Sequence, residues 1–179
     1  MTLREYFETP ESVMPQELIY GALRAAESPT PMHQQAVAGL FLALHEHVSR
    51  EQLGQVWLAP LDVVLDPDGP LVVQPDLFVI LNGGAATVSQ KVFGPPDLVI
   101  EVLSPKPRIG DTDERVTWFR EHAVRECWLV HQLTGRVDVL HFKNNRVWLH
   151  TEHARKEPIA SGVLPTFQRS LSDIFGYGN

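Results

Sequence analysis

One segment restricts the possible fold more than any other, because it places a single acidic side chain inside an apolar run. Residues 98–103 read LVIEVL, with Glu101 as the charged exception. An apolar run of this length that is rich in β-branched residues is typical of a strand covered on both faces. Burying an ionised Glu101 there without a partner would cost several kcal/mol, so the carboxyl must be paired, protonated or bound to a cation.

A second acidic residue, Asp76, raises the same problem earlier in the chain. Residues 73–81 read VQPDLFVIL and predict another buried strand that contains this carboxylate. Two acids on neighbouring strands could share a divalent metal ion, which would relieve both charges and create a catalytic centre. The pair Asp76 and Glu101 is therefore the first candidate site.

A simpler interpretation stays open for each acid taken alone. Asp76 at a strand edge after Pro75 would be solvated or bonded to backbone amides. Glu101 would form a buried ion pair with Arg115 or Lys106, because structural ion pairs perturb carboxylates as active sites do.

Composition and charge narrow the class of protein. The chain has 179 residues, of which 44% are hydrophobic, and this predicts a single domain over 1–179 with a substantial core. The formal net charge of −7 argues against tight nonspecific DNA binding by a monomer, although it does not exclude a nuclease whose acids hold a metal ion. No run approaches the roughly 20 apolar residues of a membrane span, and residues 1–16 lack the features of a signal peptide. With one cysteine, Cys127, in an apolar run, we expect a cytoplasmic protein with a buried thiol.

The pattern of apolar and turn-forming residues predicts an α/β or α+β domain around a mixed sheet. Helices are expected over 3–8, from Thr30-Pro31 through Val48, over 111–122 and over 170–175. Strands are expected over 55–65, 72–81, 97–103, 126–131, 136–142 and 147–150, with a hairpin through Asn144-Asn145 between the last two. Residues 16–26 fit either a two-stranded hairpin around Gly21 or a helix, and this choice stays open.

Short motifs along the chain point to a known family. In order they are ELIYG (17–21), SPTPMH (28–33), APLDVVL (59–65), QPD (74–76), PDLVIEVLSP (96–105) and SGVLP (161–165). Together they resemble the Uma family of putative restriction endonucleases, within the PD-(D/E)XK nuclease superfamily, over residues 17–175. The resemblance implies a restriction-endonuclease-like fold, in which a mixed β-sheet is flanked by helices and carries metal-binding acids at one edge, with an additional β-hairpin here.

The resemblance also implies roles for particular residues. Asp76 matches the metal-bridging acid of the superfamily, Glu101 matches the second acid, and Glu17 matches a further acid near the N-terminus. The implied cofactor is Mg²⁺, or Mn²⁺ in its place. His33, near the start of the long helix, matches a family histidine, for which capping or packing is the default role and a role in the site is the alternative.

The basic residue of the motif departs from the family pattern. The superfamily places a lysine two residues after the second acid, where this chain has Leu103. The family usually carries a lysine on the following helix instead, and Arg115 stands there. An arginine can stabilise a developing negative charge through a two-pronged contact, but as a permanent cation it is a poor proton shuttle.

Two functions from different classes follow. In the first, the protein is a metal-dependent DNA endonuclease that hydrolyses phosphodiester bonds, and Arg115 or Lys106 neutralises the developing negative charge. In the second, which the arginine and the acidic net charge motivate, it is a catalytically inactive, nuclease-derived binding or scaffold protein. A homodimer is compatible with either, because the predicted hairpin offers edge strands and Trp148 as a contact surface.

Overall fold

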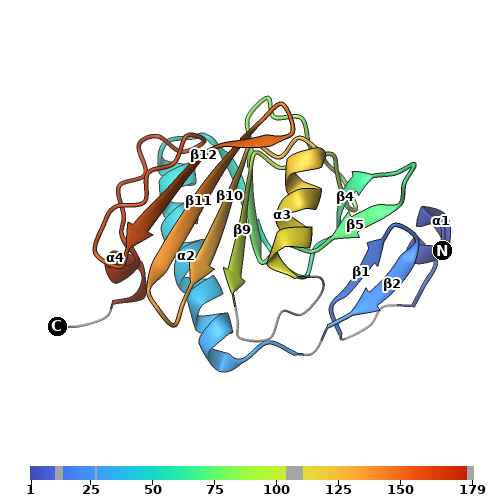
Figure 1. The fold of residues 1–179 in the computed structure, drawn as a ribbon. Helices are drawn as coiled ribbons and strands as arrows, with labels where there is room; N and C mark the ends of the chain where they lie inside the picture. Colours follow the sequence, from blue (N-terminus) through green and yellow to red (C-terminus); the bar gives the residue numbers. More distant parts are fainter. Residues whose placement is uncertain (11–13, 27, 104–110, 177–179) are drawn as a thin grey trace.

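The computed structural model describes residues 1–10, 14–26, 28–103 and 111–176, and its strands form two mixed six-stranded sheets (Figure 1). The first sheet has the order β2-β1-β5-β4-β8-β7, formed by β1 Gln16–Ile19, β2 Ala22–Ala25, β4 Val63–Asp66, β5 Leu71–Val73, β7 Thr87–Val88 and β8 Val92–Phe93. The second has the order β12-β11-β10-β9-β6-β3, formed by β3 Gly54–Leu58, β6 Leu77–Leu81, β9 Leu98–Leu103, β10 Glu126–His131, β11 Arg136–Lys143 and β12 Arg146–Ala154.

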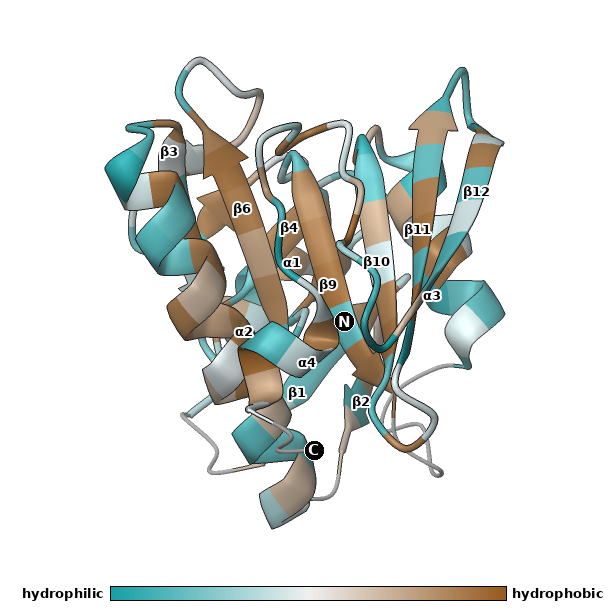
Figure 2. Ribbon diagram, turned by 90° about the vertical axis from the view of Figure 1, so that its left-hand side faces the viewer, coloured by the Kyte–Doolittle hydropathy of each residue, from teal (hydrophilic) through white to brown (hydrophobic). Residues whose placement is uncertain are grey.

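The four described helices are α1 Leu3–Phe7, α2 Pro31–Arg50, α3 Thr112–Glu121 and α4 Leu171–Phe175. Three of them, α2, α3 and α4, cover the two faces of the second sheet, while α1 packs against the first sheet through Tyr6. One core cluster joins α2 and α4 to the face that carries Leu98, Ile100 and Val102. A second cluster joins α3 and the first sheet to the opposite face, which carries Val99 and Cys127. Strand β9 is therefore buried on both sides, and Figure 2 shows apolar residues along most of β6 and β9.

Capping residues begin helices α2 and α3 at the positions predicted from the sequence. Thr30 caps α2 by accepting a hydrogen bond from the His33 backbone N–H, and Pro31 stands at the first helical position. Asp111 and Glu114 form a reciprocal capping box at the start of α3. The described part of the chain contains no helix that is both long and apolar enough to cross a membrane.

The structure also confirms the predicted hairpin through Asn144-Asn145. It shows which of the two alternatives, hairpin or helix, residues 16–26 adopt. Asn144 and Asn145 both have positive φ between β11 and β12, as a tight hairpin turn requires. Residues 16–26 form the β1–β2 hairpin, because Tyr20 and Gly21 take left-handed conformations that end one strand and start the next. Cys127 is fully buried and is a free thiol.

Three of the predicted strands were wrong in extent, and the one expected over 147–150 is longer, since β12 covers Arg146–Ala154. The strand expected over 55–65 divides into β3 and β4, and the strand expected over 72–81 divides into β5 and β6, with the halves in different sheets. A proline interrupts each one, Pro60 in the first and Pro75 in the second, because proline lacks the N–H that a strand ladder needs. Asp76 consequently lies just before β6 rather than inside a strand. The two-residue strands β7 and β8 were not predicted, since so short a segment has no periodic pattern.

The expected fold class is confirmed as a mixed α+β arrangement, with two mixed sheets in place of one. Strand β12 lies at an edge of the second sheet and carries Trp148, which is 60% exposed. That 1–179 forms one domain, and that the protein forms a homodimer, stay predictions.

Candidate active site

Strand register brings the two principal acids together. Strands β6 and β9 are antiparallel, with Leu77 opposite Ile100 and Phe78 opposite Val99. Asp76 directly precedes Leu77 and Glu101 directly follows Ile100, so the two acids adjoin the last residue pair of this register. Both residues are buried, and the charge of Asp76 contributes to the raised pKa of Glu101, so the two carboxylates lie close enough to interact.

Two groups from different elements hold the Asp76 carboxylate. Its Oδ2 atom accepts a hydrogen bond of 2.8 Å from the backbone N–H of Val102 on β9. The Nε2 atom of His33 lies 3.1 Å from the same oxygen. His33 is buried in the first turn of α2, so the capped start of this helix aims an imidazole at the site. Its place next to Asp76 favours the site role that sequence analysis left as an alternative.

Arg115 reaches Glu101 from α3. Its Nε and Nη2 atoms donate hydrogen bonds of 3.0 and 2.7 Å to one oxygen, Oε1 of Glu101. Oε2 of Glu101 accepts no hydrogen bond from the described residues. The Arg115 guanidinium also lies 5.7 Å from the ring centre of Phe119 on the same helix.

Glu17 joins the site from the first sheet through the same guanidinium. Nη1 of Arg115 donates to both Glu17 carboxylate oxygens, at 3.1 and 2.8 Å. Oε1 of Glu17 also accepts a hydrogen bond of 2.6 Å from the backbone N–H of Gln74. Within the described residues, Asp76, Glu101 and Glu17 do not bring one oxygen each to within 4.8 Å of one another. Arg115 bridges Glu17 and Glu101.

The charges of these groups leave a negative excess. Three carboxylates and one guanidinium carry a formal charge of −2 when all are ionised, which a single divalent cation would balance. Burial raises the pKa of Glu101 to about 7; the Arg115 cation opposes this rise, while the charges of Asp76 and Glu17 add to it. Burial lowers the pKa of Arg115, but the charges of Glu101 and Glu17 outweigh it, so the net shift is upward and the guanidinium stays charged. Carboxylate oxygens are the ligands that Mg²⁺ and Mn²⁺ prefer, so the donor chemistry of these residues suits such an ion, while Arg115 now lies between Glu17 and Glu101.

Comparison with known proteins places the chain in a family. The sequence profile of the Uma2 family, described as "Putative restriction endonuclease", matches residues 3–172. The chain belongs to this family. It is also similar in structure to a "putative nuclease belonging to DUF820" from Anabaena variabilis ATCC 29413, with a TM-score of 0.80 and 18% sequence identity over 98% of each chain. At this identity the likeness establishes the fold. A search of curated proteins finds no match.

The Uma2 fold supports the site with a second polar network that sequence analysis missed. The Gln74 side chain donates a hydrogen bond of 2.8 Å to the buried Asp62, while its backbone N–H holds Glu17. The Tyr6 hydroxyl donates to the same Asp62 oxygen at 3.0 Å, and Lys91 pairs with the other oxygen. Asp62 lies in the APLDVVL motif and Gln74 lies in the QPD motif. Their place in these motifs is the sequence signal that could have identified this network. Gln74 thus connects the Asp62 network to Glu17.

The departures from the family pattern have a structural counterpart. Leu103 ends β9 as a half-buried apolar residue, so the superfamily lysine position contributes no charge. Arg115 occupies the helix position where the family usually has a lysine, and it contacts two of the predicted acids. Lys106, the other cation considered for Glu101, lies outside the described residues.

Proposed function

We propose that this protein is a metal-dependent DNA endonuclease that hydrolyses phosphodiester bonds, with Mg²⁺ or Mn²⁺ as its cofactor. The observation that carries the proposal is the closeness of two buried acids, Asp76 and Glu101, which adjoin the last paired residues of β6 and β9 in a chain of the Uma2 family. Asp76 and Glu101 are the proposed ligands of the ion, and Glu17 is a further ligand or a water-positioning group.

The bound ion would lower the pKa of a coordinated water and reduce the negative charge on the scissile phosphate. The chain's own residues orient the ligands. Val102 and His33 hold the Asp76 carboxylate from two directions. Less conformational entropy of the Asp76 side chain is therefore lost when it binds the ion. Arg115 offers several N–H donors in a rigid plane and would stabilise charge that develops on phosphate oxygens.

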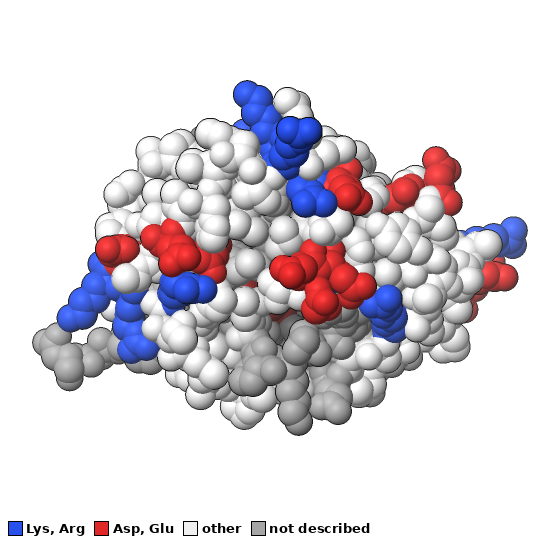
Figure 3. Space-filling view, viewed as in Figure 1, with Lys and Arg blue, Asp and Glu red and all other residues white. Residues whose placement is uncertain are grey.

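The surface around α3 also supports a role for a divalent cation. Figure 3 shows acidic side chains gathered over the start of α3, where Asp111, Asp113 and Glu114 open the helix. Such a surface repels DNA phosphates and attracts divalent cations. We therefore propose that DNA approaches this face together with the metal ion.

A second candidate function, an inactive binding or scaffold protein, is favoured by one observation. Arg115 bridges Glu17 and Glu101, so its positive charge already offsets part of the negative charge that a metal ion would neutralise. In that case the acids and Arg115 form an ion-pair network whose role is structural, and such networks perturb buried carboxylates as active sites do.

A cleavage assay tests the proposed activity. Supercoiled plasmid and duplex oligonucleotides are incubated with the protein in Mg²⁺, Mn²⁺ or EDTA. We expect cleavage with either metal ion and none in EDTA, and we expect Asp76→Ala to abolish it. Asp68→Asn is the matched control, since it removes an exposed carboxylate in the turn between β4 and β5 and should leave cleavage unchanged. Substrates left uncut by the wild-type protein in both ions would remove the endonuclease proposal.

Calorimetry separates the two candidate functions independently of substrate choice. A nuclease site binds Mn²⁺ in the absence of DNA and loses this binding in Glu101→Gln. A scaffold with an internal ion pair binds no Mn²⁺ at this site in either protein.

A further inference from the structure

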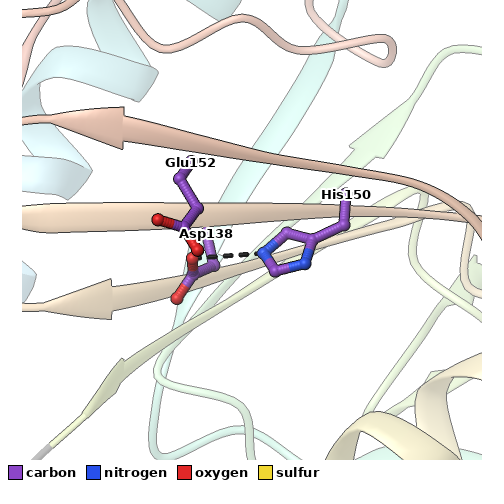
Figure 4. Close-up of side chains that lie close together, drawn as sticks. All are labelled: Asp138, His150 and Glu152. Atoms are coloured by element: carbon purple, nitrogen blue, oxygen red, sulfur yellow. Dashed lines mark hydrogen bonds and ion pairs between the residues drawn. The ribbon is translucent and has the colours of Figure 1, made fainter.

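A second group of potential metal ligands lies on β11 and β12, two strands away from Glu101. Asp138, His150 and Glu152 each offer one ligand atom, and these atoms lie within 4.8 Å of one another (Figure 4). Glu152 is the direct cross-strand partner of Asp138, and Nε2 of His150 lies 3.2 Å from Oδ1 of Asp138. His131, at the end of β10, directs its Nε2 atom to the other Asp138 oxygen.

We propose that Asp138, His150 and Glu152 form a binding site for a zinc-class divalent cation, in which His131 positions the Asp138 carboxylate through its other oxygen. An imidazole beside two carboxylates suits Zn²⁺, whereas Mg²⁺ prefers oxygen ligands alone. The site is therefore chemically distinct from the acids around Asp76. It would hold the edge strand β12 to β11.

The geometry requires only a small adjustment of exposed side chains. Zinc bonds of about 2.0–2.2 Å in a tetrahedron place neighbouring ligand atoms roughly 3.3–3.6 Å apart. Asp138 is 7% exposed and anchored, while the His150 and Glu152 side chains are 46% and 57% exposed and can rotate toward it. The Asp138 ligand is thus fixed in place, whereas the His150 and Glu152 side chains can adjust to a cation.

Arg136 is the competitor that a cation would displace. Its Nη2 atom lies 3.1 Å from Asp138, and its Nη1 atom lies 3.7 Å from Glu152. Its Nε atom is buried and has no hydrogen-bond partner within the described residues. The Arg136 side chain is partly exposed, so it can turn to solvent when the carboxylates bind a cation. Removing this guanidinium should strengthen metal binding rather than weaken it.

The two sites share one face of the second sheet. Leu129 on β10 pairs with Glu101 on one side and with Asp138 on the other. Two strand spacings separate Glu101 from Asp138, which corresponds to about 10 Å. A cation at the second site would therefore add positive charge to the face that carries the candidate active site, without sharing its ligands.

Isothermal titration of tag-free, metal-free protein with ZnCl₂ tests the proposal. We expect one Zn²⁺ per chain, weakened by at least about tenfold in His150→Ala and in Glu152→Gln. Arg136→Gln should bind Zn²⁺ more tightly than the wild type. His150 and Glu152 are exposed enough for these variants to fold, which far-ultraviolet circular dichroism checks.

Two control variants test whether a loss of Zn²⁺ binding is specific to the proposed site. His153→Ala removes an imidazole from the opposite face of the same strand, and Glu101→Gln alters only the candidate active site; both should bind Zn²⁺ as the wild type does. Absence of Zn²⁺ binding in the wild type, or wild-type affinity in His150→Ala, would overturn the proposal. So would an equal loss in His153→Ala. None of these outcomes depends on whether the protein cleaves DNA.

Discussion

Arg115 donates two hydrogen bonds to a single oxygen of Glu101, and this contact ties α3 to the central strand β9. The same guanidinium binds Glu17 on β1, in the first sheet. One side chain therefore connects the two sheets at the point where the candidate site lies. Its dual contact makes Arg115 the most informative residue to change.

Removing the Arg115 charge should destabilise the metal-free protein. Arg115→Leu leaves Glu17 and Glu101 buried without their cation, and breaking a buried pair in this way costs about 3–5 kcal/mol. Urea unfolding in EDTA measures the change in free energy. Arg120→Leu, on the same helix but in a more exposed ion pair, should cost roughly 1 kcal/mol or less. Equal losses in the two variants would contradict the bridging role of Arg115.

Restoring the lysine that the family usually carries at this position should increase catalysis. A lysine can lose its proton when buried, whereas an arginine stays charged, so Arg115→Lys supplies a proton-transfer group that the wild type lacks. We expect the cleavage rate constant in Mg²⁺ to rise by about tenfold or more. Arg120→Lys should leave the rate unchanged. A rate in Arg115→Lys below that of the wild type would show that the two-pronged arginine contact is required.

The raised pKa of Glu101 predicts a pH-dependent stability in EDTA. The folded protein binds this proton more tightly than the unfolded chain does, because the pKa rises from 4.5 to about 7. The resulting stabilisation is fully present below pH 4.5 and is lost as the pH rises to about 7. Relative to Glu101→Gln, the wild type should lose on the order of 3 kcal/mol across this window.

Urea unfolding of both proteins between pH 4.5 and 8 measures this difference. Saturating Mn²⁺ should flatten the wild-type curve if the ion binds Glu101, since the cation favours the carboxylate. A wild-type minus Glu101→Gln difference that is constant with pH would contradict the raised pKa.

The contact between His33 and Asp76 predicts an effect on metal affinity. His33→Ala removes a partner that orients the carboxylate, and partners of this kind typically contribute about 10–100-fold to metal binding. Calorimetric titration with Mn²⁺ should show a loss in this range. His45→Ala is the matched control, because His45 is an exposed histidine on the same helix. Unchanged Mn²⁺ affinity in His33→Ala would assign His33 to packing alone.

The proposed homodimer can be tested at the β12 edge. Trp148 is exposed on this strand, and an aromatic side chain at an unpaired sheet edge is a typical contact for a second copy. Light scattering should give twice the chain mass for the wild type and the chain mass for Trp148→Glu. A monomeric wild type at high concentration would remove the dimer.

Part of the site could be predicted from the sequence because its requirements are local. An acid inside the run LVIEVL must be compensated wherever the strand lies, so Glu101 was identifiable from composition and periodicity alone. Asp76 was a candidate from its apolar surroundings as well, and the family motif favoured a site role over that of an ordinary strand-edge acid. The contact of Arg115 with Glu17, 98 residues apart in the chain, was not predictable, since it depends on how the first sheet packs against α3.

The sequence by itself determined the elements whose signals are local: the caps of α2 and α3, the asparagine turn between β11 and β12, and the doubly buried strand β9. The tertiary structure alone decided how the chain passes between two sheets at Pro60 and Pro75, and which distant charges meet. The physical reason is that hydrogen-bonded turns and apolar periodicity act between near neighbours in the chain. Strand register and helix packing instead bring together side chains, such as those of His33 and Asp76, whose separation no local pattern records.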